Sequence, residues 1–142
     1  MNRRYKSALR LAALGGVIVV FCASVSMAAA PVVNPVITPA HPYVDDNVRV
    51  AFTDPRSLSA DSEIDVVLFG AGVCSSSLAD KTIKGPQRAG RRYRVRFRPA
   101  DQIVGSGAEW CQGKAKVRIA ESKNGSFVRK LAERPIRFRA KS

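Results

Sequence analysis

The feature that most constrains the fold of this chain is a strict alternation of arginine with apolar residues between Arg92 and Arg98. The apolar positions are Tyr93, Val95 and Phe97, and the positions between and around them are Arg92, Arg94, Arg96 and Arg98. Successive side chains of a β-strand point to opposite faces, so this period of two predicts a strand with one buried and one solvated face. Pro99 ends the strand because it has no backbone N–H to donate.

The same period of two recurs at four other places in the sequence. These segments are residues 48–52, 64–69, 114–119 and 136–139. Asn124 and Gly125 form the dipeptide preferred in type I′ hairpin turns, so the last two segments are expected to pair through a hairpin. Pro135 requires a bulge or an edge position within the final strand.

Three further segments give weaker patterns. Residues 32–38 lie among prolines and are expected to be extended only as an edge strand or a polyproline stretch. Residues 75–90 are polar and are interpreted as a long connection with a short edge strand at Thr82 and Ile83. Residues 126–133 begin the last strand or, alternatively, form an amphipathic helical turn.

The first thirty residues have the pattern of an export signal. The basic residues Arg3, Arg4, Lys6 and Arg10 precede an apolar segment at residues 11–21, and small residues follow it. We expect a secretory signal peptide at residues 1–28, cleaved after Ala28 or Ala29, and therefore a secreted or periplasmic protein. Apolar and small residues run on to residue 30, so an uncleaved membrane anchor is the alternative.

Removal of this leader leaves Cys74 and Cys111 as an even pair in an oxidising compartment, which predicts one disulfide. In the chain-entropy view such a bridge stabilises the fold by roughly 3 to 4 kcal/mol. The two cysteines do not form a C-x-x-C motif, and His41 is the single histidine of the chain. These are too few soft ligands for a zinc or copper site, so we expect no metal and no cofactor.

Six or seven short strands separated by turns, with no helical period, predict an all-β fold. With the Trp110-Cys111-x-Gly113 sequence before the penultimate strand, the pattern resembles the immunoglobulin-like and fibronectin-type modules of exported bacterial proteins. The resemblance implies an immunoglobulin-like antiparallel β-sandwich at residues 44–142, preceded by a Pro-rich segment and edge strand at residues 29–43. It also implies that segments 64–69 and 114–120 are antiparallel neighbours, which brings the two cysteines to the same end of the sheet. Trp110 is expected to cover the disulfide or an edge of the core.

The basic charge belongs to the predicted domain rather than to the leader. Of 24 Lys and Arg, four lie in the leader, which leaves 20 against 11 Asp and Glu, a net charge of +9. The candidate residues for binding an anion are Arg92, Arg94, Arg96, Arg98, Lys114, Lys116, Arg118, Arg137 and Arg139. On the predicted sandwich, the four arginines of the segment 92–98 lie beside Arg49 on one sheet. The other five basic residues share the second sheet. Asp65, on the strand next to that of Lys116, is expected to be the main acidic compensation.

Like charges on paired strands destabilise a sheet. We therefore hypothesise that at least one basic face binds an anionic envelope polymer or an acidic surface of another exported protein. The alternative is that these charges are solvated and only keep the protein in solution.

Other functions find less support in the sequence. His41 alone is a poor basis for a hydrolytic triad, and the acids Asp61, Glu63, Asp65, Asp101 and Glu109 have no spacing that selects a catalytic pair. Nucleic acid is disfavoured as a specific ligand because Tyr93 and Phe97 alternate away from the arginines. We expect a non-enzymatic binding module, with a purely structural domain and a small exported hydrolase as the alternatives. A membrane contact is expected only through an uncleaved leader.

Overall fold

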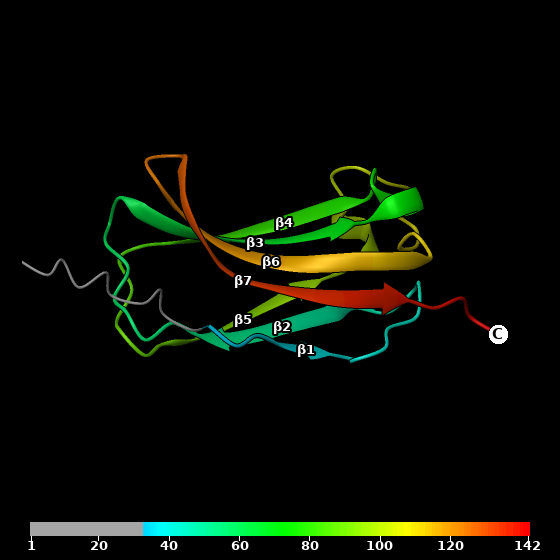
Figure 1. The fold of residues 1–142 in the computed structure, drawn as a ribbon, viewed down its shortest axis with the longest axis horizontal. Coiled ribbons are helices and arrows are strands. Elements are labelled where there is room, and N and C mark those ends of the chain that lie inside the picture. The colour runs from blue at the N-terminus through cyan, green and yellow to red at the C-terminus, as the bar shows by residue number, and fades with distance from the viewer. Residues whose placement is uncertain (1–32) are drawn as a thin grey trace, which may run out of the picture.

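Residues 33–142 are described by a computed structural model, and the predicted leader with its cleavage site lies outside the described residues. This part of the chain forms seven strands in two antiparallel sheets that lie face to face (Figure 1). The strands are β1 (Val36–Thr38), β2 (Val48–Thr53), β3 (Ser62–Gly70), β4 (Leu78–Lys84), β5 (Arg92–Phe97), β6 (Gly113–Lys123) and β7 (Ser126–Phe138), with short 3₁₀ turns η1 (Gly72–Cys74) and η2 (Pro99–Asp101). The strand orders are β1-β2-β5 and β4-β3-β6-β7. The all-β, two-sheet antiparallel sandwich predicted from the sequence is confirmed.

The core consists of the apolar residues that the alternation assigned to one face of each strand. In the three-stranded sheet, Val50 lies opposite Val95 and Phe52 opposite Tyr93. The buried residues of the core are Val48, Val50, Phe52, Ile64, Val66, Leu68, Ala79, Tyr93, Val95, Phe97, Ala115, Val117, Ile119, Ile136 and Phe138, together with residues from the connecting segments. Because the two apolar faces bury each other, the arginines between Tyr93, Val95 and Phe97 are turned to solvent.

The predicted neighbours β3 and β6 pair along their whole length, and this pairing brings the two cysteines together. Gly70, the last residue of β3, lies opposite Ala115 near the start of β6. Cys74 in η1 and Cys111 before β6 form a disulfide with a Cα–Cα distance of 5.5 Å. The η1 turn folds so closely over the end of β3 that a Cβ on Gly70 would lie 1.7 Å from the Cys74 carbonyl oxygen.

Trp110 closes the core beside this disulfide, as expected for a residue at the core edge. Its side chain is buried and its ring stacks on that of Phe138 at a centroid distance of 5.4 Å. The indole N–H donates a hydrogen bond of 2.8 Å to the backbone carbonyl of Asp46. Trp110 therefore ties the segment before β2 to the end of β7.

The structure corrects two of the weaker predictions. The expected long connection at residues 75–90 contains the strand β4, which pairs with seven consecutive residues of β3. As an edge strand it buries only Ala79 fully, so its apolar alternation is faint in the sequence. The helical alternative for residues 126–133 is wrong, because these residues begin β7. β7 is an edge strand, as Pro135 requires, and its register shifts lie nearer the hairpin turn, beside Ala120 and Ser122.

An ion-pair network links the two sheets at the end of the sandwich away from the disulfide. The buried carboxylate of Asp54, just after β2, receives hydrogen bonds from Arg56 Nε and Nη2 at 3.3 and 3.1 Å. Arg56 Nη1 also donates to Glu121 on β6 at 3.0 Å. Burial raises the pKa of the Glu121 carboxyl, but hydrogen bonds from Arg129 and Arg56 outweigh it and hold the pKa below its usual value.

Removal of the disulfide should destabilise the fold without changing it. A Cys74→Ala/Cys111→Ala variant is expected to lose about 3 to 4 kcal/mol of unfolding free energy, because the bridge restricts the unfolded chain over a separation of 37 residues. Urea denaturation followed by Trp110 fluorescence measures the loss. Reductant should lower the stability of the wild type to that of the variant and leave the variant unchanged. Equal unfolding free energies for the variant and the wild type without reductant would contradict this role of the disulfide.

Tyr93 offers a substitution that should not destabilise the core. Its hydroxyl is buried and has no hydrogen-bond partner among the described residues, and burial followed by the nearby Asp54 charge raises its pKa. Tyr93→Phe removes the unsatisfied group and keeps the tilted ring contact with Phe52, so the free energy of unfolding should rise by about 1 kcal/mol. Thermal and urea denaturation test this, and a loss of similar size would show that the hydroxyl has a partner in solution.

Candidate functional site

The outer surface of the three-stranded sheet carries arginines and no acidic residue. Arg49 on β2 lies directly opposite Arg96 on β5, Ala51 lies opposite Arg94, and Thr53 lies opposite Arg92. The outward positions of the edge strand β1 are Val36 and Thr38. We call Arg49, Arg92, Arg94 and Arg96 the arginine face.

The arginine face is unpaired as well as basic. None of its four arginines takes part in an ion pair between residues 33–142, although ten such pairs occur there. A shallow groove of about 320 Å³ crosses this face over Ala51, and its lining includes all four arginines. Val36, which is 61% exposed, forms part of the same groove. The site therefore offers guanidinium groups around a small apolar floor.

Arg98, the last arginine of the alternating segment, is placed differently. Its Nη2 and Nε donate to Asp101 at 2.9 and 3.2 Å, and the Asp101 carboxylate accepts the Arg98 backbone N–H. Hydrogen bonds from the Arg98 side chain and backbone lower the pKa of Asp101 from 3.8 to about 2. The i, i+3 spacing of Arg98 and Asp101 across Pro99 is a local signal that the sequence analysis did not use.

The second sheet pairs its central basic residues with an acid. Glu133 on β7 lies opposite Arg118 and accepts from Lys116 Nζ at 3.1 Å and from Arg118 Nε at 2.9 Å. Hydrogen bonds from Lys116 and then Arg118 lower the pKa of the Glu133 carboxyl. The expectation that Asp65 is the main acidic compensation is wrong, because Asp65 accepts hydrogen bonds from Thr82 and Ser122 and Glu133 forms the ion pairs with Lys116 and Arg118.

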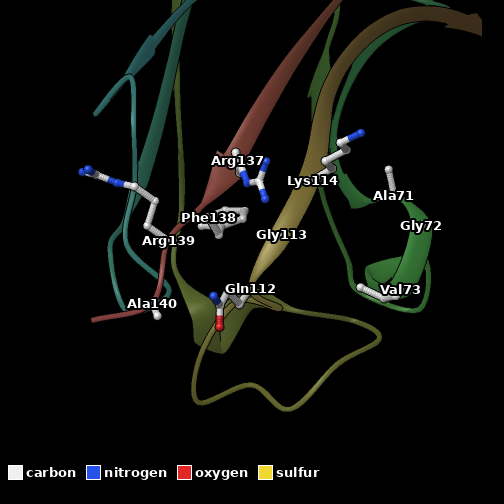
Figure 2. A pocket seen from close by; sticks show the side chains of 10 residues that line it. All are labelled: Ala71, Gly72, Val73, Gln112, Gly113, Lys114, Arg137, Phe138, Arg139 and Ala140. Carbon is white, nitrogen blue, oxygen red and sulfur yellow. The ribbon is translucent and has the colours of Figure 1, made fainter. Parts of the chain in front are cut away.

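Lys114 and Arg137 lie opposite each other where β6 begins and β7 ends. They line a groove of about 450 Å³ whose far wall is the η1 turn with Val73, as Figure 2 shows. Neither side chain forms an ion pair with the described acidic residues. The Arg139 side chain points away from Lys114 (Figure 2). Its guanidinium lies 4.4 Å from the ring centre of Tyr43 and donates a hydrogen bond to the His41 carbonyl.

His41 lies beside the groove that Lys114 and Arg137 line. The adjoining cavity that includes His41 is lined by Ala40, His41, Ala71, Lys114, Ala115, Lys116, Pro135, Ile136 and Arg137. That lining contains no carboxylate, hydroxyl or thiol. Among residues 33–142, no group of three or more His, Cys, Asp or Glu residues is close enough to hold a metal ion.

The structure thus divides the nine predicted binding residues into three sets. Arg92, Arg94 and Arg96 join Arg49 on the arginine face, whereas Lys114 and Arg137 share the groove near the disulfide. The remaining four, Arg98, Lys116, Arg118 and Arg139, each contact an acid or an aromatic ring within the fold.

Comparison with known proteins adds no assignment. No family model matches the chain, and no curated protein is significantly similar to it. In the part of the chain that the structure covers, no helix is long and apolar enough to cross a membrane.

The Arg98–Asp101 contact should be visible in the pH dependence of stability. A carboxyl whose pKa is lowered by folding stabilises the protein above its unfolded pKa, and this contribution is lost as the pH falls toward about 2. Between pH 5 and pH 2 the loss of unfolding free energy should be smaller in Asp101→Asn than in the wild type. We expect a difference of about 1 kcal/mol, reduced from the full shift because Arg98 is solvated.

Arg98→Gln serves as the companion variant in the same urea titrations. Without the guanidinium the pKa of Asp101 should return toward its ordinary value, so the loss of unfolding free energy between pH 5 and pH 2 should be smaller than in the wild type, as in Asp101→Asn. Identical pH profiles for all three proteins would contradict the contact.

Proposed function

We propose that this protein is an exported, non-enzymatic binding module that holds an anionic polymer of the cell envelope on its arginine face. The observation that carries the proposal is the absence of any acidic partner for Arg49, Arg92, Arg94 and Arg96 among the described residues. A face built only to stay in solution has no need to place Arg49 directly opposite Arg96, since like charges across a strand pair reduce stability.

The spacing of the arginines suits a linear ligand. Side chains on one face of a strand repeat about every 7 Å, and neighbouring strands lie about 4.8 Å apart. Arg92, Arg94 and Arg96 therefore form a row, with Arg49 beside its Arg96 end. A flexible chain with repeated phosphate, sulfate or carboxylate groups can meet several guanidinium forks at once. The shallow, open groove fits such a chain better than an enclosed small molecule.

The other parts of the proposal rest on the sequence and on the disulfide. The leader pattern at residues 1–28 favours export, and the disulfide is compatible with an oxidising compartment. The resemblance to immunoglobulin-like and fibronectin-type modules of exported bacterial proteins agrees with a binding role. An acidic surface of another exported protein is the second ligand class, because it presents the same carboxylates.

Heparin and poly-glutamate serve as test polyanions with sulfate and carboxylate charges. Arg94→Gln/Arg96→Gln should weaken heparin binding about tenfold and reduce the slope of log affinity against log salt by about 2, one for each lost contact. Isothermal titration calorimetry at several salt concentrations measures both quantities.

The matched control is Lys116→Gln/Arg118→Gln, which removes the same charge from residues that already form ion pairs with Glu133. This variant should retain most of the affinity. If the two variants lose affinity equally, binding depends on net charge and not on the arginine face. If the wild type binds neither polymer at low salt, the proposal fails and a structural role in an envelope assembly becomes the better account.

A further inference from the structure

The β6–β7 hairpin carries an exposed apolar pair that the arginine face does not explain. Phe127 is 67% exposed and Val128 is 47% exposed, and they are adjacent at the start of β7. Every residue from 123 to 130 is exposed, so no other segment covers this end of the hairpin. Figure 1 shows the hairpin curving away from the two sheets at the end of the sandwich opposite the C-terminus.

The backbone of the hairpin holds this pair at its tip. Asn124 and Gly125 have φ angles of 51° and 75°, the left-handed conformation that a type I′ turn requires. The pairing with β6 then shifts register beside Ser122, so that Phe127 lies opposite Ser122 and Arg129 opposite Glu121. Val128 is thus the extra residue of a bulge, and Arg129 anchors the strand behind it through a 2.8 Å bond to Glu121.

The exposed charge around the apolar pair is mainly basic. The segment 122–132 contains Lys123, Arg129 and Lys130 and no acidic residue. Each of these cations pairs with an acid outside the segment, namely Asp61, Glu121 and Glu133. The cations are 43% to 54% exposed, whereas Glu121 and Glu133 are only 13% and 20% exposed. An exposed aromatic and an aliphatic side chain beside exposed cations is the composition by which a surface element enters the headgroup region of an anionic bilayer.

We propose that the tip of the β6–β7 hairpin docks this protein on an anionic lipid bilayer, with Phe127 and Val128 entering the interface and Lys123, Arg129 and Lys130 facing the headgroups. This contact comes from the folded domain, not from the leader, and it is independent of the proposed polymer binding. The hairpin and the arginine face lie on different sheets, so a bilayer and a polymer can be held at the same time.

A tryptophan at position 127 reports the docking directly. Trp110, the only native tryptophan, is 3% exposed, and its emission should change little when the protein meets a membrane. In Phe127→Trp the new emission should shift to the blue with vesicles of phosphatidylcholine and phosphatidylglycerol, and brominated lipids should quench it. Pure phosphatidylcholine vesicles should give a much smaller change. The chain is expressed with its leader and purified from the exported fraction.

Phe127→Ser/Val128→Ser tests the energetics in vesicle co-sedimentation. The partition coefficient should fall at least about tenfold, because two apolar side chains no longer leave water. Val36→Ser removes an equally exposed apolar side chain from the arginine face and should leave the partition coefficient unchanged. Heparin affinity should survive in Phe127→Ser/Val128→Ser, which separates failure of this inference from failure of the polymer proposal.

Two outcomes would overturn the inference. In one, the emission of Phe127→Trp stays unchanged with vesicles. In the other, the partition coefficient of Phe127→Ser/Val128→Ser equals that of the wild type while Arg94→Gln/Arg96→Gln abolishes vesicle binding. The second result would assign vesicle binding to electrostatic adsorption on the arginine face, and would leave the hairpin for a protein partner.

Discussion

The rest of the structure depends on the burial of one face of each sheet against the other. Val50, Phe52, Tyr93 and Val95 from the three-stranded sheet pack in one core with Val66, Leu68, Val117 and Ile119 from the four-stranded sheet. Strand geometry allows no other placement of the residues between them, because neighbouring side chains point to opposite faces. The arginines of β5 are therefore exposed by the same burial that stabilises the fold, and hydrophobic packing fixes the direction of the charges.

The two outer surfaces use their basic residues in different ways. On the four-stranded sheet Glu133 lies between Lys116 and Arg118 and converts like-charge repulsion into ion pairs. On the three-stranded sheet no acid lies at the corresponding outward positions, and its outward arginines form no ion pair with the described residues. An unpaired, solvated arginine costs the fold little, whereas several in one row concentrate positive potential on one surface. The contrast between the sheets supports a functional interpretation of the arginine face over one based on net charge.

The two ends of the sandwich are closed by different chemistry. Near the start of β6 a disulfide, the close approach of η1 to Gly70 and the stack of Trp110 on Phe138 fix the loops. At the other end Arg56 joins Asp54 to Glu121, and beyond it the β6–β7 hairpin is uncovered. Because the core is closed beneath it, the hairpin can keep Phe127 and Val128 exposed without loosening the domain. The proposed polymer site and the proposed membrane contact can thus coexist on one small scaffold.

The local pattern of the sequence was enough to determine which side chains are buried on the strongly alternating strands, where the hairpin turns and which cysteines pair. These properties depend on strand parity, on the left-handed preference of Asn124-Gly125 and on the pair of cysteines outside the predicted leader, all of which are local or compositional. The full extent of strand β4 was not predicted, because an edge strand buries too few side chains to impose a clear apolar alternation on the sequence. Which charges meet was decided by tertiary structure alone. Glu133 reaches Lys116 and Arg118, and Asp65 does not, because the register of β6 against β3 and β7 is set by packing over the whole sheet.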